Sequence, residues 1–464
     1  MTIDYPTASA GELASALRAR KVSAVELART AIARIEAMDG AVNAVIVRDF
    51  DRALAAATAA DEKLAAGAPG ALLGVPMTVK ESYDLVGWPS TWGLERLASH
   101  RATEDAVVVQ RLKAAGAIIL GKTNVPPNLA DWQSDNPVYG RANNPHVLTH
   151  SPGGSSGGGA AAVAAGFTPL EMGGDIGGSI RVPASFCGIF GHKTSYGIVP
   201  MTGHTLGGGK SAPGALSVGG PLARSAADLD LVLGVVAGPD GDNAKGYRLE
   251  LPAPRHSKLA DYRVLVIDHH PRATTSLDIK AALECLGASL EKAGARVARE
   301  SDLVPDLAHY HSTYIKMLRT VVTRRDPAER PPISAHDWMD LLDVQADYRR
   351  QWAELFEAFD AVIMPAFGTS SYPHASAASQ WKDRTLRIDG EDTPFGDQMA
   401  WQGPAILGHL PSTAVPLGKN SEGLPIGAQI MGGFLEDRTT ISLAGLIHPE
   451  PAAIADMARA TEMA

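Results

Sequence analysis

The chain lacks the features that would place it among secreted, membrane-spanning or nucleic-acid-binding proteins. It has only two cysteines, Cys187 and Cys285, among 464 residues. This excludes a disulfide framework and any Cys-x-x-Cys motif, and it favours a reducing compartment. No stretch approaches the roughly 18 consecutive apolar residues of a membrane-spanning helix. Lysine and arginine form no cluster and the formal net charge is −9, which argues against nucleic acid as a partner.

The N-terminus has no basic segment followed by an apolar one, so we expect no secretory signal peptide. These absences together predict a cytoplasmic protein that does not associate with membranes. The composition that remains is ordinary for a globular protein, with 45% hydrophobic and 20% charged residues. A chain of this length and composition can bury a large core, either as one large α/β domain or as two to three smaller domains.

Helical and strand patterns alternate along the first part of the chain. Residues 1–60 are predicted to be helical, because two Ser-x-x-Glu capping boxes precede leucines at helical spacing. The apolar runs over 71–80 and 115–123 predict buried strands of a parallel or mixed sheet. An amphipathic helix is expected between them, over 105–115.

The same alternation continues in the second half. Strands are expected over 262–268 and 295–300, a helix over 276–294, and a helix leading into a strand over 351–367. Alternation over the whole length predicts a single α/β domain with helices on both faces of its central sheet. Residues 302–400 have weaker periodicity, and we interpret them as a cap or insertion beside the core.

Two short motifs suggest functions that their context does not support. Residues 116–123 fit GxxxxGK[ST], the phosphate-binding loop, but the residues between the glycines are themselves a buried strand and two prolines follow at once. A strand and turn is the better interpretation. Residues 153–157 fit GxSxG, the nucleophile elbow, which requires a strand before it and a helix after it. The preceding segment HVLTHSP makes at most a poor strand.

A third motif is a more credible catalytic candidate. In MGGDIGGSIRVP the glycines at 177 and 178 allow a tight turn and close approach of a ligand to the backbone. Successive amides in such a turn form an anion-binding nest, so Ser179 would have an oxyanion hole beside it. The alternative is a glycine-rich turn whose serine caps a short helix, and the residues alone do not decide between the two.

If Ser179 is a nucleophile it needs a base, and the surrounding stretch contains no histidine. A lysine can serve when burial or nearby cations keep it neutral. Lys80, Lys122 and Lys193 each end or closely follow an apolar run, although each could also be a lysine that extends from a strand end to solvent. The pattern does not choose among them. Ser155 or Ser156 could relay the proton if the amine cannot touch the nucleophile.

These residues match a known family. GGSSGGGAAAVAAG (153–166) followed by GGDIGGSIRVPASFCGIFGHKTSYG (173–197) resembles the amidase signature family. The segments GVPMTVKES, AGAIILGKTNVP, DNPVYGRANNPH, GGPLARSAADLDLVL and GLPIGAQIMGG resemble further blocks of that family in the same order. Together they cover most of the chain. The resemblance implies one α/β domain over 1–464, with a central mixed sheet wrapped by helices and its signature core at 71–222.

The resemblance also implies a Ser–cis-Ser–Lys triad. By position, Ser179 would be the nucleophile, Ser155 the relay serine after a cis peptide bond, and Lys80 the base. The backbone amides of Ile176, Gly177, Gly178 and Ser179 would form the oxyanion hole. Because the base must be neutral to act, activity is expected to favour neutral to alkaline pH.

Other residues receive supporting roles. Asp175 and Arg181 flank the turn and are expected to hold its shape, the alternative being an ordinary exposed pair. Ser156 is expected to form hydrogen bonds within its loop.

Leu129, Trp132 and Gln133 follow the block AGAIILGKTNVP and are candidates for the substrate pocket, with ordinary loop packing as the alternative for each. An apolar or aromatic acyl or amine group is the preferred substrate feature.

The sequence departs from the family at several positions. Residues 124–128 read NVPPN where members often have an Asn-Met-Pro-Glu-Phe type segment, and TNVP is closer to the fatty acid amide hydrolases. His192 and Thr194 replace usual residues and are expected to alter packing behind the nucleophile. Gly159 and Gly174 stand where small polar residues are common.

The function implied by the resemblance is hydrolysis of the C–N bond of a carboxylic amide through an acyl-enzyme. Esters and carbamates are accessible to the same chemistry. No metal and no cofactor is expected, the partner is a small-molecule substrate, and a homodimer is left open. The alternative is the glutaminase-type subunit of a tRNA-dependent amidotransferase, although DWQSDNPVYG differs from the Ser/Thr-rich version expected there.

Overall fold

The structure, a computed structural model, describes residues 3–208, 214–323, 333–376, 379 and 381–462. Its centre is an 11-stranded sheet with the strand order β1-β3-β2-β6-β8-β7-β14-β15-β11-β9-β10. The strands are β1 (Val45–Arg48), β2 (Pro76–Lys80), β3 (Ile118–Thr123), β6 (Leu170–Asp175), β7 (Phe190–Lys193), β8 (Val218–Ala223), β9 (Arg263–Val266), β10 (Arg296–Ala298), β11 (Ala361–Pro365), β14 (Ser412–Lys419) and β15 (Pro425–Met431).

The sheet is mixed. Strand β2 runs parallel to both β3 and β6, and β9 runs parallel to β10 and β11. The remaining neighbours are antiparallel. Two short ribbons lie outside the sheet: β4 (Asp135–Asn136) with β5 (Gly140–Arg141), and β12 (Thr385–Ile388) with β13 (Glu391–Pro394).

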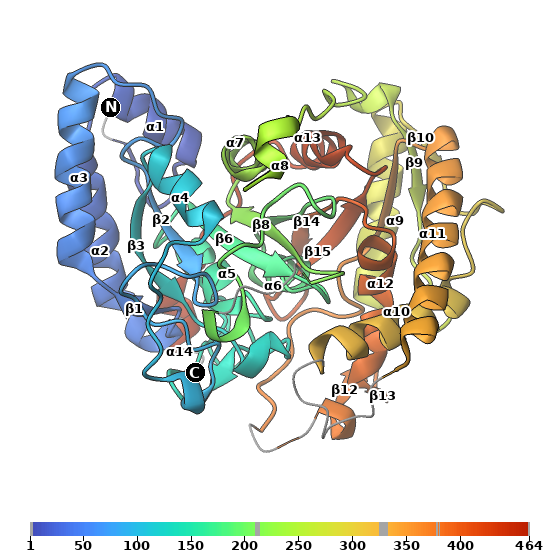
Figure 1. Cartoon of the computed structure of the whole chain (residues 1–464). Helices are drawn as coiled ribbons and strands as arrows, with labels where there is room; N and C mark the ends of the chain where they lie inside the picture. Colours follow the sequence, from blue (N-terminus) through green and yellow to red (C-terminus); the bar gives the residue numbers. More distant parts are fainter. Residues whose placement is uncertain (1–2, 209–213, 324–332, 377–378, 380, 463–464) are drawn as a thin grey trace.

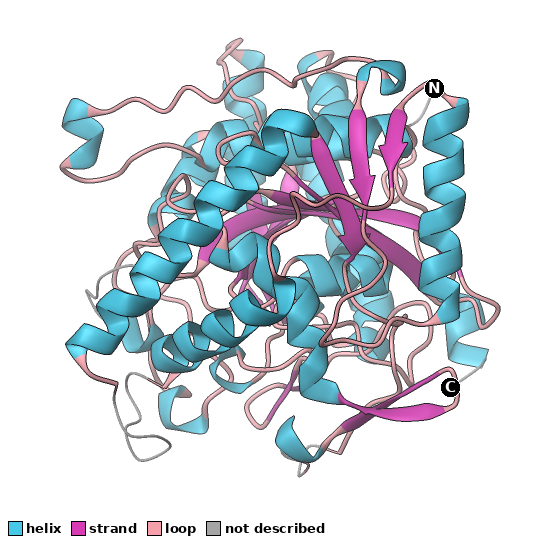
Figure 2. Cartoon of the chain, turned by 90° about the vertical axis from the view of Figure 1, so that its right-hand side faces the viewer, coloured by secondary structure: helices cyan, strands magenta, loops and turns pink. Residues whose placement is uncertain are grey.

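Helices surround the sheet, as Figures 1 and 2 show. They are α1 (Ala10–Arg18), α2 (Ala24–Val42), α3 (Phe50–Ala65), α4 (Val107–Ala114), α5 (Gly157–Ala164), α6 (Arg181–Cys187), α7 (Ala226–Val236), α8 (Asn243–Gly246), α9 (Leu277–Lys292), α10 (Leu307–Val322), α11 (Ala335–Ala358), α12 (Met399–Leu407), α13 (Asp437–Ile447) and α14 (Met457–Glu462). Helices α2 and α3 lie at one end of the molecule, and α9 to α11 lie at the other.

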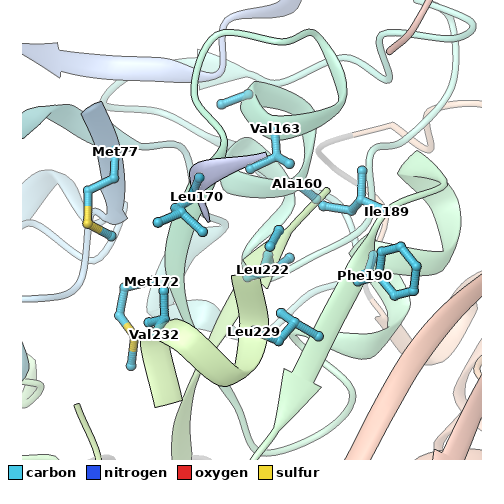
Figure 3. Packing of buried hydrophobic residues seen from close by; sticks show 14 of the residues in the cluster. Met77, Ala160, Val163, Leu170, Met172, Ile189, Phe190, Leu222, Leu229 and Val232 are labelled. Atoms are coloured by element: carbon cyan, nitrogen blue, oxygen red, sulfur yellow. The ribbon is translucent and has the colours of Figure 1, made fainter. Parts of the chain in front are cut away.

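The two faces of the sheet carry different helices. Helices α5 and α6 pack on one face, and α7 and α13 pack on the other. The apolar side chains between β6, β8 and these helices are fully buried (Figure 3), and include Leu170, Met172, Leu222, Leu229 and Val232. The fold prediction of one α/β domain with helices on both faces is therefore confirmed.

Most predicted elements are present with shorter bounds, but the helix expected from residue 351 begins at Ala335, and strand β1 (Val45–Arg48) interrupts the region 1–60 that was predicted to be helical. Both capping boxes form, at Ser9 before α1 and Ser23 before α2. The expected strand over 71–80 begins only at Pro76, and that over 115–123 only at Ile118. In each case a glycine precedes the strand at positive φ, Gly74 at 84° and Gly116 at 90°, a backbone conformation that turns the chain instead of extending it.

Residues 302–400 do not lie wholly beside the core. Strand β11 joins the central sheet between β15 and β9, whereas α10, α11 and the β12–β13 ribbon lie outside it. This strand is the one predicted at the end of 351–367. It is buried along its whole length, so this part of 302–400 belongs to the core and not to a cap or insertion.

Among the described helices, none is long and apolar enough to cross a membrane.

Candidate active site

Lys80 is the last residue of β2, and its side chain is buried. Its Nζ donates to Ser155 Oγ at 2.7 Å and to the Gly174 carbonyl oxygen at 3.3 Å. The residue is only 1% exposed. Burial lowers the pKa of Lys80 to about 7, against the opposing attraction of Asp175 and Glu171. A substantial fraction of this amine is therefore neutral, and able to accept a proton, near neutral pH.

The other two candidate lysines are buried but have different partners. Lys122 donates to the Pro89 carbonyl oxygen and to the Ser90 hydroxyl. Lys193 donates to the carbonyl oxygens of Thr194 and Leu410. Neither forms a hydrogen bond with a serine of the two glycine-rich motifs in the described part of the chain. Of the three lysines that the sequence left open, Lys80 alone is bonded to Ser155.

Ser155 and Ser156 lie in the loop that leads into α5. The peptide bond between Gly154 and Ser155 is cis. The Ser156 amide donates to the Ser179 carbonyl oxygen at 3.2 Å, and the Ser156 hydroxyl donates to the Gly174 carbonyl oxygen at 3.3 Å. Ser156 thus ties its own loop to β6 and to the second motif, which brings the two serine motifs together.

The turn that carries Ser179 is held from inside by Asp175. This carboxylate accepts hydrogen bonds from the Gly178 amide at 2.8 Å and the Ile180 amide at 3.1 Å. It also pairs with Arg181 at 3.1 Å, and both side chains are fully buried. Arg181 keeps the pKa of Asp175 below its usual value despite burial. The pair is a buried clamp on the turn, not an exposed pair.

Ser179 follows two glycines, and its hydroxyl is free. It is 5% exposed, and its hydroxyl makes no hydrogen bond within the described residues. The amides of Gly177 and Ser179 are also unpaired there. The Gly178 amide, predicted as an oxyanion donor, instead donates to Asp175.

The three pocket candidates occupy different places. Trp132 is buried and donates from Nε1 to the Gly177 carbonyl oxygen at 2.8 Å, so it touches the turn directly. Gln133 is buried as well, but both ends of its amide bind the backbone of Ala375. Leu129 lies on a half-exposed turn at φ 59° and, within the described residues, makes no hydrogen bond to the turn that carries Ser179.

Three further residues contact the turn from the α10–α12 region. The Tyr314 hydroxyl donates to the Ile176 carbonyl oxygen at 3.1 Å. Met399 lies against Gly177, and Gln402 lies so close to Gly178 that a Cβ there would be 2.5 Å from Gln402 Oε1. Gly178 also has φ 89°, so it must be glycine for both reasons. No local sequence signal identifies these contacts, because they come from distant segments.

The residues behind the turn that carries Ser179 form a closed polar network. His192 bonds Thr413 through Nδ1 at 2.9 Å and Asp437 through Nε2 at 3.0 Å. The Thr194 hydroxyl donates to the Gly219 carbonyl oxygen. All these side chains are fully buried, so this histidine packs the sheet and has no access to substrate.

Within the described residues, no group of three or more His, Cys, Asp or Glu side chains could hold a metal ion. The arrangement instead brings together a buried amine, two serine hydroxyls and unpaired backbone amides. These are the groups that acyl transfer by a serine nucleophile with a lysine base would require.

The comparisons with known proteins identify the family to which this fold belongs. The family model described as Amidase matches residues 26–326 and 316–441. The chain is 33% identical to a glutamyl-tRNA(Gln) amidotransferase subunit of Ralstonia nicotianae, over 93% of this chain and 95% of that protein. It is 31% identical to an acylamidase of Rhodococcus erythropolis, over 94% of each.

A solved structure from a vestigial protein complex that reveals the origins of an s-triazine catabolic enzyme is also similar. It superposes with a TM-score of 0.82 at 27% identity, over 96% of this chain and 100% of that one. The chain therefore belongs to the amidase signature family.

Proposed function

We propose that this protein hydrolyses the C–N bond of a carboxylic amide, with Ser179 as nucleophile, Ser155 as proton relay and Lys80 as base. The observation that carries the proposal is the 2.7 Å contact between Lys80 Nζ and Ser155 Oγ in a fully buried setting. The free Ser179 hydroxyl beside unpaired amides supports it. The family membership and the acylamidase relative favour the same reaction class.

The reaction proceeds in two halves. Neutral Lys80 takes the proton of Ser155, and Ser155 takes the proton of Ser179 as its oxygen bonds to the carbonyl carbon. The amides of Gly177 and Ser179 stabilise the resulting oxyanion. The C–N bond then breaks, the proton returns through Ser155 to the departing amine, and Ser179 is left as an ester. Water adds to this ester with the same groups as base, and the acid is released.

The surroundings of Trp132 favour a substrate with an apolar or aromatic group. Trp132 makes ring contacts with Phe367, Trp381 and Phe395 at centroid distances of 4.9, 4.8 and 5.3 Å. Trp132 links this buried aromatic cluster to the oxyanion turn, and an aryl acyl or amine group would suit a position beside it. Esters and carbamates carry the same electrophilic carbonyl and fall within the proposal.

A second candidate is the glutaminase-type subunit of a tRNA-dependent amidotransferase. The relative from Ralstonia nicotianae is the observation that favours it. That function predicts glutamine as the amide and activity only when a partner subunit is present. A free-standing hydrolase predicts activity of the chain alone on simple amides.

The test is turnover by the purified chain alone. Anilides, aryl esters, aryl carbamates and glutamine would be offered separately, with released amine, phenol or ammonia quantified for wild type and Ser179→Ala. Release that depends on Ser179 from anilides, esters or carbamates supports the hydrolase. No release by the chain alone, with release from glutamine that depends on Ser179 once a partner subunit is added, supports the second candidate. Release that is equal in Ser179→Ala contradicts both, because both use the same nucleophile.

A further inference from the structure

A buried carboxyl group, Glu171, lies on the same face of the sheet as Lys80. Glu171 is paired with Thr78 in the parallel register of β6 and β2, and Lys80 is paired with Thr123 in the register of β2 and β3. Paired residues share a face, and so do residues two apart on a strand. Thr123, Lys80, Thr78 and Glu171 therefore form one polar patch across three strands.

The Glu171 side chain crosses over β2 within this patch. Its Oε1 accepts a hydrogen bond from the Thr123 hydroxyl on β3 at 2.7 Å, and β2 is the strand between β3 and β6. The carboxyl group must therefore pass between the side chains of Thr78 and Lys80. Its second oxygen, Oε2, is buried with no hydrogen-bond partner in the described structure, so no donor there is paired with it.

Helix α5 makes room for this side chain. A Cβ at Gly159 would lie 2.4 Å from Glu171 Cγ and 2.7 Å from Oε1, distances at which no side chain fits. Gly159 is in the first turn of α5, just after Ser155 and Ser156. The glycine that departs from the family pattern is thus the position at which α5 admits a carboxyl group under the catalytic loop.

The charges around the two groups are few. Facing Lys80 are Glu171 and Asp175 from β6, with His204 from the loop after β7. Asp175 forms an ion pair with Arg181 on α6, and the charge of Lys193 on β7 also lowers its pKa. Facing Glu171 are the hydroxyls of Thr78 and Thr123, the phenol of Tyr83, and Lys80 as the cation. Burial raises the pKa of Glu171, and Lys80 opposes this rise.

We propose that Glu171 is a positioning residue for the reaction, whose carboxylate is the counter-charge for protonated Lys80. When Lys80 takes the proton from Ser155, a cation forms in a site closed to water. Asp175 attracts Lys80 but is shared with Arg181, whereas Glu171 forms no ion pair in the described structure, so its charge is available to stabilise that cation. The inference rests on the proposed function, since it assigns Glu171 a role through the base.

The test uses the pH dependence of labelling by a fluorophosphonate, which needs no known substrate. The second-order rate constant would be measured from pH 5 to pH 10 for wild type, Glu171→Gln and Lys80→Met. Glutamine keeps the size of the side chain but cannot carry charge. In the acid limb of the profile, the part in which the rate constant falls as the pH falls, we expect the curve of Glu171→Gln to lie about one pH unit lower than that of wild type. The reason is that Lys80 loses an attractive charge, which lowers its pKa. The plateau should fall about tenfold, because the base is weaker.

Asp228→Asn provides a matched control. Asp228 is equally buried, its pKa is also raised by burial, and it caps α1 through the amides of Ala10 and Gly11. This variant should lose stability but keep the wild-type limb. A Glu171→Gln profile with the wild-type limb would overturn the inference. If Lys80→Met labels as fast as wild type, the proposed function itself is wrong, so the two failures are distinguishable.

Thr123→Val tests the inference if Glu171→Gln does not fold. Removing the Thr123 hydroxyl makes the carboxylate form of Glu171 less stable, since it loses its hydrogen-bond donor. The acid limb should then move in the same direction as in Glu171→Gln, by a smaller amount. An unchanged limb in folded Thr123→Val would count against Glu171 as the counter-charge.

Discussion

The amine of Lys80 donates a 2.7 Å hydrogen bond to the hydroxyl of Ser155, a residue 75 positions later in the chain. The contact is made because β2 delivers the lysine to its carboxyl end, while the Ser156 backbone and side chain tie the serine loop to β6 and to the Ser179 turn. Burial lowers the pKa of Lys80, so that part of the amine is neutral near pH 7 and can accept a proton, whereas an exposed lysine would be almost fully protonated. The proposed chemistry depends on that change.

The first prediction concerns pH. Burial lowers the pKa of Lys80 to about 7, and only the neutral amine can accept a proton. Below pH 7 the neutral fraction falls about tenfold per unit, so kcat/KM should rise with pH and level off above pH 7. The profile measured with any active anilide or ester checks this. A rate that rises as the pH falls would contradict a lysine base.

The second prediction concerns the base itself. Lys80→Met keeps an unbranched side chain of similar length but has no proton acceptor, and it should lower the turnover rate by about 10²–10⁴-fold. Lys122→Met is the matched control, since Lys122 is an equally buried lysine with a lowered pKa but is bonded to Pro89 and Ser90. Per folded molecule, Lys122→Met should retain wild-type turnover. Equal losses in both variants would show that the effect is structural.

The third prediction concerns the clamp on the turn. Asp175→Asn leaves the Arg181 cation unpaired in a fully buried site, which should lower the free energy of unfolding by about 3–5 kcal/mol. Denaturant unfolding measures this value. Asp242→Asn, which breaks an exposed pair with Lys245, should change it little. If the two variants were equally stable, the burial of the Asp175–Arg181 pair would be contradicted.

The fourth prediction concerns Trp132. Trp132→Phe keeps an aromatic ring but removes the indole N–H that donates to the Gly177 carbonyl oxygen. Loss of one such hydrogen bond is worth about 0.5–1.5 kcal/mol, so the rate of fluorophosphonate labelling should fall by about 2–12-fold. Trp381→Phe is the control, because Trp381 contacts Trp132 through its ring and makes no hydrogen bond to the turn in the described structure. A larger loss in Trp381→Phe than in Trp132→Phe would be inconsistent with this role.

Much of the fold could be read from the sequence, because its elements have local causes. The capping boxes at Ser9 and Ser23 fix the starts of two helices, and continuous apolar runs mark β2 and β3. Strand boundaries were less certain, since Gly74 and Gly116 leave the extended conformation inside apolar runs. A strand was predicted at the end of 351–367, where β11 lies, but the weak periodicity of 302–400 did not show that this strand belongs to the central sheet.

The site was predictable only where residues are adjacent. The turn around Ser179 carries its own glycines and its own clamp, Asp175 and Arg181. The choice of Lys80 over Lys122 and Lys193 followed from the resemblance, because burial alone does not separate the three. The roles of Tyr314, Gln402 and Glu171 depend on contacts between distant strands and helices, and no local pattern encodes them.

The most direct test of the central claim is to locate the nucleophile. Wild type, Ser179→Ala and Ser155→Ala would be exposed to a fluorophosphonate, digested, and examined by mass spectrometry. The account predicts a single adduct on the peptide that contains Ser179, no adduct in Ser179→Ala, and slow labelling of Ser179 in Ser155→Ala. An adduct on another residue of wild type, or one that persists in Ser179→Ala, would contradict the assignment of the site.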